Sequence, residues 1–319
     1  MDNILKKIVK NKKIEVKNKK ELFSLDLIKK YPLYKRKTIS LKSNLNSSKS
    51  GIIAEFKRRS PSKKNINLDL SIYDVAKSYE KNGACGMSIL TDIKYFGGSL
   101  EDLIQVRSNS NLPLLRKEFI IDKYQIHESK AFGADIILLI ASILSKKQII
   151  EFSSIAKNID LEVLIEVHNE LELDKSLVKN IDFIGVNNRD LKTFDVNIDI
   201  SKKLSSKIPD NYLKVSESGI KSIKDIKILK SYGFKGFLIG KRTPRRDPFL
   251  RLIYSKIFKV FHNIVIGAKL SDPSCPFVLG HTSEYKKLPK ELLLFMREGF
   301  WWGFVAVCTI KNMKLEEMN

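Results

Sequence analysis

The sequence predicts an α/β fold, a parallel (β/α)8 barrel with an N-terminal helical extension. Short apolar runs alternate with charged stretches of helical period between residues 51 and 240. Gly83, Gly133 and Gly233 stand where such helices would end. Eight runs are present, and eight parallel strands close into a barrel. An open doubly wound sheet is the alternative, although no G-x-G-x-x-G follows the first run. The expected strands are GIIAEFK (51–57), CGMSILT (85–91), PLLRKEF (113–119), DIILLI (135–140), EVLIEV (162–167), DFIGVN (182–187), YLKVSES (212–218) and GFLIG (236–240).

The pattern divides the chain into three parts. Residues 1–50 are expected to form an arm, with two short basic helices within 2–31 and a Ser/Asn-rich linker over 33–50. The catalytic barrel is expected over 51–258. Residues 259–319 form an atypical C-terminal extension, for which the pattern indicates no barrel unit.

The formal net charge of +22 is concentrated in the two ends. Residues 1–50 carry 15 Lys and Arg against 4 Asp and Glu, and residues 241–319 carry 14 against 7, which leaves +4 for residues 51–240. Biased genome composition and a polyanion partner both explain such ends. The barrel itself is nearly neutral, so nucleic acid is not its expected partner.

Cysteine usage and hydropathy indicate a cytoplasmic protein. Cys85, Cys275 and Cys308 share no close spacing, which favours neither a disulfide framework nor a zinc site. Lysines interrupt the first twenty residues, so no secretion signal is expected. The apolar run at 300–310 is too short to span a bilayer.

Chemically capable residues stand at the carboxyl ends of six predicted strands, where a barrel builds its active site. In the first strand Glu55 and Lys57 share one face, because residues two apart point the same way. Burying two opposite charges is costly unless they are paired or hydrogen-bonded. A structural ion pair would explain the polar residues at the end of any one strand, but it does not explain the same placement in six strands. The others offer Arg116 and Lys117, Glu166, Asn187 and Arg189, Ser216, Glu217 and Ser218, and Gly240.

Two lysines and two glutamates at one mouth predict general acid/base chemistry. Clustered ammonium groups should depress each other's pKa, which would make a lysine a better proton donor near neutral pH. A Schiff base with a carbonyl substrate is the alternative, since residue type alone does not choose between them.

An anion site is predicted beside this cluster. Ser218-Gly219 and Gly240 end the seventh and eighth strands, the usual phosphate position of a barrel, and Ser60 lies on the adjacent rim. Arg189 can hold a second anion such as a carboxylate. The expected substrate is a phosphorylated small molecule.

These residues occur in motifs that resemble the indole-3-glycerol phosphate synthase family of tryptophan biosynthesis. The resemblance covers residues 1–240, and it implies a carboxy-lyase that closes the indole ring of 1-(2-carboxyphenylamino)-1-deoxyribulose 5-phosphate with loss of CO2 and water. It implies no cofactor or metal. A monomer or homo-oligomer is expected, with other tryptophan-pathway enzymes as candidate partners. The motifs are AEFKRRSPS, ILTD with YFGGS, LLRKEFIIDKYQI, GADIILLI, LIEVH, IGVNNRDLKTF, VSESGI and FLIG.

The resemblance also implies roles. Lys117 would be the general acid on the substrate's keto oxygen, and Glu166 its acid/base partner. Glu55 and Lys57 would complete the proton-transfer network, with Lys57 a candidate donor to the leaving hydroxyl. The remaining residues would anchor substrate: Asn187, counted with the catalytic residues, Arg189 near the carboxylate, Ser60, Ser218, Gly219 and Gly240 around the phosphate, and Phe96 and Phe119 as walls for the aromatic ring. Core packing explains these phenylalanines equally well. His168 is expected to start the next helix or to support a catalytic residue, and not to be a catalyst itself.

The resemblance is expected to end after Gly240, where the chain reads KRTPRRDPFLRLIY. Lys241 departs from the family, and Pro244 and Pro248 would interrupt a closing helix that began before 248. Three explanations of residues 259–319 stay open. The segment packs on the barrel, forms an oligomer contact through 300–307, or results from a reading-frame change, and the last is favoured.

Two further functions stay open. One is a barrel that binds nucleic acid through its basic ends. The other is a phosphoribosyl isomerase, which would need an Asp/Cys acid-base pair for which Cys85 is poorly placed.

Overall fold

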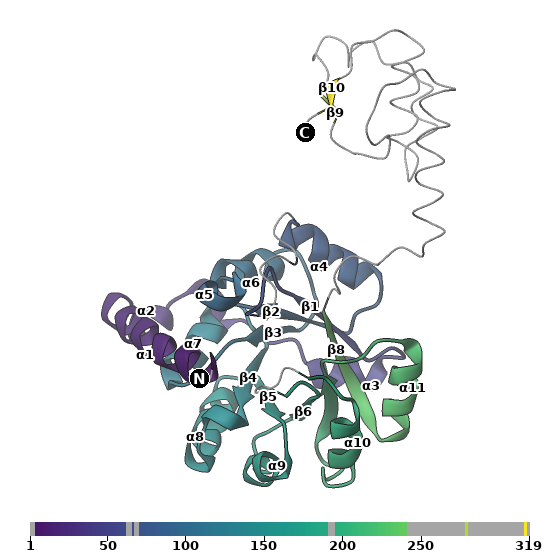
Figure 1. The fold of residues 1–319 in the computed structure, drawn as a ribbon. Coiled ribbons are helices and arrows are strands. Elements are labelled where there is room, and N and C mark those ends of the chain that lie inside the picture. Colours follow the sequence, from purple (N-terminus) through teal and green to yellow (C-terminus); the bar gives the residue numbers. More distant parts are fainter. Residues whose placement is uncertain are drawn as a thin grey trace. The chain divides into compact units, whose positions relative to one another are not determined.

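The computed structural model describes residues 4–61, 66, 70–190 and 195–240, and the backbone of 278–279 and 316–317 (Figure 1). The chain forms two compact units, residues 1–242 and 243–319. In the second unit the described residues form two short antiparallel strands, β9 (Val278–Leu279) and β10 (Glu316–Glu317). The predictions for Lys241, for the barrel boundary at 258 and for the run at 300–310 lie outside the described residues.

Eight parallel strands close into a barrel in chain order, which confirms the predicted fold. The first strand pairs with both the second and the last, so the ring of strands is complete. Seven expected runs contain their whole strand, and the eighth strand begins at Phe234, two residues before its expected run. The strands are β1 (Ile52–Phe56), β2 (Gly86–Leu90), β3 (Leu114–Lys117), β4 (Ile136–Ile140), β5 (Glu162–Val167), β6 (Phe183–Asn187), β7 (Leu213–Glu217) and β8 (Phe234–Gly240).

Helices surround the barrel (Figure 1). Gly83, Gly133 and Gly233 each follow the end of one and adopt a φ of 76°, 92° and 83°, a left-handed conformation that favours glycine. None of the described helices is long and apolar enough to cross a membrane. The helices and 3-10 turns after β1 are α4 (Ile72–Lys81), α5 (Ile93–Phe96), α6 (Leu100–Arg107), α7 (Lys123–Ala131), η2 (Ala141–Ile143), α8 (Lys146–Asn158), α9 (Glu170–Ser176), α10 (Asp199–Ser205) and α11 (Ile223–Ser231).

The N-terminal arm differs from the expectation of two short helices and a linker. It begins with one long helix, α1 (Ile4–Leu22), followed by α2 (Leu25–Ile28) and a 3-10 turn η1 (Pro32–Lys35). The region expected as a linker contains α3 (Leu41–Ser47), which Ser40 caps at its N-terminus. The long helix continues through its lysines because lysine is a good helix former.

Helix α3 closes the amino-terminal end of the barrel. Its Leu41 and Leu45 are buried in one cluster with inward-facing strand residues such as Ile53, Leu115 and Val215. Glu162, at the start of β5, holds the helix by accepting hydrogen bonds from the Leu41 amide at 2.8 Å and the Ser40 hydroxyl at 2.5 Å. One end of the barrel is therefore filled, and the opposite end is available for chemistry.

The ion pairs of a buried lysine hold helix α1 beside the open end of the barrel. The Lys12 side chain is 1% exposed and its Nζ lies 3.1 Å from both Asp92 Oδ2 and Glu118 Oε1, whose side chains are equally buried. Burial opposes the charged form, but Glu118, Asp92 and Glu15 overcome it and raise the pKa of Lys12 above its ordinary value. This lysine therefore stays charged and balances two buried carboxylates.

We expect Lys12→Met to lower the free energy of unfolding by about 3 kcal/mol, because it leaves Asp92 and Glu118 without that charge. Urea unfolding of the full chain measures the change. Lys13→Met, at an exposed position of the same helix, should change it by less than about 0.5 kcal/mol. Equal effects of the two substitutions would contradict a role for the buried ion pairs.

Candidate active site

The open end of the barrel is lined by a layer of charged residues. Each lies two positions after an inward-facing apolar residue of the same strand. Side chains two positions apart in a strand share a face. The inward positions of β1, β3, β5 and β7 therefore change from apolar to charged over two residues. The four changes are Ile53 to Glu55, Leu115 to Lys117, Leu164 to Glu166, and Val215 to Glu217.

Lys117 is the centre of this layer. Its Nζ donates a hydrogen bond to Glu217 Oε2 and lies 3.4 Å from Glu166 Oε2. The Lys117 side chain is 14% exposed, whereas those of Glu166 and Glu217 are 7% and 1% exposed. The ammonium is thus held between two buried carboxylates at the mouth of the barrel.

Gly185 makes room for this contact. A Cβ atom at this position of β6 would lie 2.4 Å from Glu217 Oε1, which no side chain permits. The glycine therefore allows the Glu217 carboxylate to turn inward towards Lys117.

The depressed lysine pKa expected from the sequence is wrong for Lys117. Burial lowers its pKa, but the carboxylates of Glu217, Glu166 and Glu55 outweigh burial, and the net pKa is raised. Three carboxylates around the ammonium reverse the effect predicted from lysine clustering. Lys117 is therefore fully protonated at neutral pH.

The two carboxylates beside Lys117 titrate differently. Burial raises the pKa of Glu217 to about 7, and the neighbouring Glu166 and Glu55 add to the rise against the attraction of Lys117. Burial also acts on Glu166, but Lys117, His168 and the Asn187 hydrogen bond prevail and lower its pKa. At neutral pH Glu166 is a carboxylate that can accept a proton, whereas Glu217 is close to half-protonated.

Glu55 and Lys57 form a second pair on the same rim. Lys57 Nζ donates to Glu55 Oε1 at 2.5 Å, and the carboxylate is 6% exposed. Burial opposes ionisation, but Lys57 and Lys117 lower the pKa of Glu55. A Cβ at Gly240, the last residue of β8, would lie 3.1 Å from Glu55 Oε1, so this glycine borders the pair.

The end of β6 brings its predicted residues to the cluster. Asn187 Nδ2 donates to Glu166 Oε1 at 3.2 Å, which orients the carboxylate. The backbone N–H of Arg189 donates to Asn187 Oδ1 at 3.0 Å, so the turn after the strand fixes the amide. Asn187 lies in the charged layer, and Arg189 lies on the rim.

The predicted phosphate residues lie at neighbouring strand ends. Ser218 and Gly219 follow β7 in left-handed conformations with φ of 63° and 75°. Asn188 Nδ2 holds this turn by donating to the Ser218 carbonyl at 3.1 Å. Gly240 ends β8, which pairs with β7. Ser60 lies in the loop after β1.

Phe96 and Phe119 lie together on the opposite side of the ring of strands, after β2 and β3. Their ring centroids are 6.0 Å apart with an interplanar angle of 36°. Two adjacent aromatic faces at the mouth suit a flat aromatic ligand.

Two residues, Arg116 and Glu217, differ from their sequence interpretation. Arg116 is buried on the outer side of β3, where it donates to Glu128 Oε2 at 2.7 Å and to Ser129 Oγ at 3.1 Å, so it is structural. Glu217 was absent from the predicted site residues, although its alternation with Val215 on the inward face of β7 could have indicated it. Cys85 is buried in one cluster with Leu41 at the closed end, in agreement with the expectation that it is poorly placed for an acid-base pair.

Comparison with known proteins identifies the family. The family model for indole-3-glycerol phosphate synthase matches residues 5–249. A protein of that name from Prochlorococcus marinus (strain MIT 9215) is 46% identical over 265 residues, which are 79% of this chain and 90% of that protein. Another from Bacteroides thetaiotaomicron is 42% identical over 248 residues, 77% of this chain and 95% of that protein.

The chain belongs to the indole-3-glycerol phosphate synthase family. It is therefore an enzyme, a lyase of tryptophan biosynthesis. The match of the indole-3-glycerol phosphate synthase model extends to residue 249, so the expectation that the resemblance ends at Gly240 is wrong. The segment KRTPRRDPF still falls within the family's length.

The raised pKa of Glu217 makes the stability of this synthase fold depend on pH. Between its ordinary pKa of 4.5 and about 7 the folded protein keeps a proton that the unfolded chain has lost. The free energy of unfolding should therefore fall as pH rises through this window. At about pH 8 we expect Glu217→Gln to be more stable than wild type by about 2 kcal/mol, and at about pH 4 equally stable.

Urea unfolding at both pH values measures this difference. Glu151→Gln, at an exposed position of α8, is the control and should show no pH-dependent gain. A Glu217→Gln variant that is less stable than wild type at the higher pH would show that the ionised carboxylate stabilises the fold.

Proposed function

We propose that the charged layer at the barrel mouth closes the indole ring of 1-(2-carboxyphenylamino)-1-deoxyribulose 5-phosphate, with release of CO2 and water. The observation that carries this proposal is the position of Lys117 between Glu166 and Glu217. A charged donor and an ionised acceptor lie within one substrate's reach, as acid/base ring closure and dehydration require.

Lys117 is the general acid. Its raised pKa keeps it an ammonium at neutral pH, so it protonates the keto oxygen as the aryl carbon attacks the carbonyl carbon. The new carbon–carbon bond pushes the carbonyl electrons onto that oxygen, which becomes a hydroxyl. Loss of CO2 then leaves its electron pair in the ring and restores aromaticity.

Glu166 is the base of the dehydration. It removes a proton from the ring-closed intermediate while the hydroxyl leaves as water. Lys57, paired with Glu55 on the rim, donates the proton that the departing hydroxyl needs. Asn187 holds Glu166 Oε1 in place during this step.

The substrate is held at its two ends. Ser60, Ser218, Gly219 and Gly240 bind the phosphate, since two of these are glycine positions where backbone N–H groups approach an anion closely. Arg189 pairs with the carboxylate on the aromatic ring. Phe96 and Phe119 enclose that ring.

We assign this activity to the cytoplasm, with the phosphorylated small molecule as the partner of the site. The monomeric or homo-oligomeric state and an association with other tryptophan-pathway enzymes stay predictions. The isomerase alternative loses support because Cys85 lies at the closed end, where burial raises its pKa to about 11.

The experiment follows indole fluorescence after the full chain is mixed with the carboxyphenylamino-deoxyribulose phosphate. We expect steady turnover, and a dephosphorylated substrate should raise KM by about a hundredfold or more, since charge-assisted contacts to phosphate are lost. Binding of the substrate without any indole product would contradict the proposal. Modest dependence of kcat/KM on salt would also separate this enzyme from a polyanion binder, whose affinity falls steeply.

A further inference from the structure

His168 makes contacts that a purely structural histidine does not need. It follows β5 directly, two residues after Glu166. Its Nε2 lies 3.4 Å from Glu166 Oε1, and its Nδ1 lies 3.0 Å from Glu172 Oε2 on α9. The imidazole therefore stands between a proposed catalytic carboxylate and a second carboxylate outside the barrel mouth.

Glu172 fixes the ring and its tautomer. Its Oε2 also accepts from the His168 backbone N–H at 2.9 Å, and its Oε1 accepts from Asn169 Nδ2 at 3.1 Å. Burial opposes ionisation, but the His168 contacts lower the pKa of Glu172. An ionised carboxylate only accepts hydrogen bonds, so the network assigns a hydrogen to Nδ1.

The other ring nitrogen is the one that gains or loses a proton. Nε2 is buried and has no hydrogen-bond partner among the described residues. In the neutral ring it carries a lone pair, and it faces Glu166 Oε1, which is also an acceptor. Two acceptors at this distance are favourable only when one proton lies between them.

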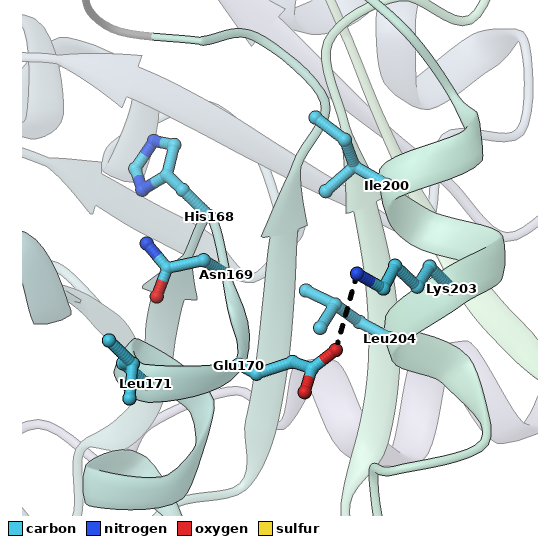
Figure 2. A pocket seen from close by; sticks show the side chains of 7 residues that line it. All are labelled: His168, Asn169, Glu170, Leu171, Ile200, Lys203 and Leu204. Carbon is cyan, nitrogen blue, oxygen red and sulfur yellow. Dashed lines mark ion pairs between the residues drawn. The ribbon is translucent and has the colours of Figure 1, made fainter.

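His168 is one of the residues that line a pocket. The pocket has a volume of about 430 Å³ and lies between the start of α9 and helix α10 (Figure 2). Glu170 and Lys203 form an ion pair of 3.4 Å across it. The side chain of His168 is 11% exposed, although its Nε2 atom is buried.

We propose that His168 takes from Glu166 the proton that Glu166 has removed from the substrate, and returns it through Glu166 to water at the barrel mouth after the product has left. The inference rests on the proposed function. The O–H bond of protonated Glu166 breaks and a bond from hydrogen to Nε2 forms, which gives a carboxylate and an imidazolium. Return of that proton from Nε2 to Glu166, and from Glu166 to water at the open mouth, restores the neutral ring. His168 acts through Glu166 and is a positioning residue in this sense.

The transfer has a definite pH dependence. The groups that face His168 are Glu166 on β5, Glu172 on α9 and, further away, Glu217 on β7. Burial lowers its pKa, but these three carboxylates prevail and hold the pKa above its ordinary 6.5. Below that pKa Nε2 already carries a proton and cannot accept another. The kcat of wild type should therefore fall as pH decreases through this value.

The test compares kcat and KM over pH for wild type, His168→Asn and Glu172→Gln. In His168→Asn we expect kcat at about pH 8 to fall about tenfold, KM to stay within about twofold, and the acid limb that begins above 6.5 to disappear. In Glu172→Gln the limb should move to lower pH, because one carboxylate that favours the imidazolium is gone. His127→Asn, at the partly buried histidine on α7 beside Tyr34, is the matched control and should keep the wild-type profile.

An unchanged acid limb in His168→Asn, or a limb that does not move in Glu172→Gln, would overturn the proposal. In either case turnover by wild type and its loss in Glu166→Gln would leave the proposed function intact. A wild type that forms no indole product would overturn both. If His168→Asn fails to fold, the direction of the limb in Glu172→Gln alone decides.

Discussion

Lys117→Met is expected to lower kcat by about a thousandfold or more. The change removes the only proposed donor to the keto oxygen and retains the length of the side chain. It also leaves Glu166 and Glu217 without the ammonium between them, so Glu217 should become fully protonated at neutral pH. Fluorescence of the indole product measures kcat.

Two further variants test whether the loss of activity is specific to the proton that the Lys117 ammonium donates. Lys117→Arg preserves the positive charge but does not release a proton near neutral pH, so it should fold like wild type and remain nearly as inactive as the methionine variant. Lys214→Met, on β7, removes a lysine that donates to the Ser205 carbonyl at 2.8 Å near the other end of its strand. It should retain kcat, and a comparable loss there would point to a general effect of losing a barrel lysine.

Glu166→Gln is expected to lower kcat by about a hundredfold to ten-thousandfold while KM changes little. The amide keeps an oxygen that accepts from Asn187, so the geometry at the end of β6 is retained and only the base is lost. Glu166→Asp retains the carboxylate but withdraws it from Lys117, so an intermediate loss is expected.

Glu162→Gln is the matched control for Glu166, since it changes the same residue type on the same strand at the closed end. Its carboxylate holds α3 through Ser40 and Leu41. We expect lower stability and unchanged kcat. If Glu166→Gln turned over at the wild-type rate, the base would have to be sought elsewhere in the layer, with Glu217 as the first candidate.

Alternation within single strands was enough to predict most of the site. Glu55 and Lys57, Lys117, Glu166 and Asn187 are all visible as polar residues at the carboxyl ends of apolar runs, and parallel strands bring those ends together. Arg116 was not separable from Lys117 in this way, because the face of each residue depends on where the strand begins. The structure places Arg116 outside the ring and Lys117 inside it.

Residue types alone could not predict the electrostatics of the layer. Counting two lysines and two glutamates led to a depressed lysine pKa, but the outcome depends on which charges are nearest. Lys117 has Glu217 and Glu166 as its nearest charges, and Lys57 pairs instead with Glu55. The strand register that sets these distances requires the closed barrel.

Contacts between distant segments explain the remaining differences. Lys12 belongs to a basic helix, and lysines are mostly exposed in folded proteins. It nevertheless lies 3.1 Å from Glu118 Oε1, more than a hundred residues later. Helix α3 is short and polar in sequence, and only the apolar floor of the barrel explains why Leu41 and Leu45 are ordered there. The sequence around Lys12 and around α3 does not indicate which distant residues they contact.

The central claim is that the Lys117 ammonium donates the proton during ring closure, and chemical rescue of Lys117→Ala tests it most directly. Primary alkylammonium ions small enough to enter the space left by the side chain are added, and the rate of indole formation is followed at fixed substrate. The account predicts that the rate rises in proportion to the ammonium concentration and increases as the acidity of the ammonium increases. A variant that binds the substrate but gains no rate from any ammonium ion would contradict the assignment of Lys117 as the acid.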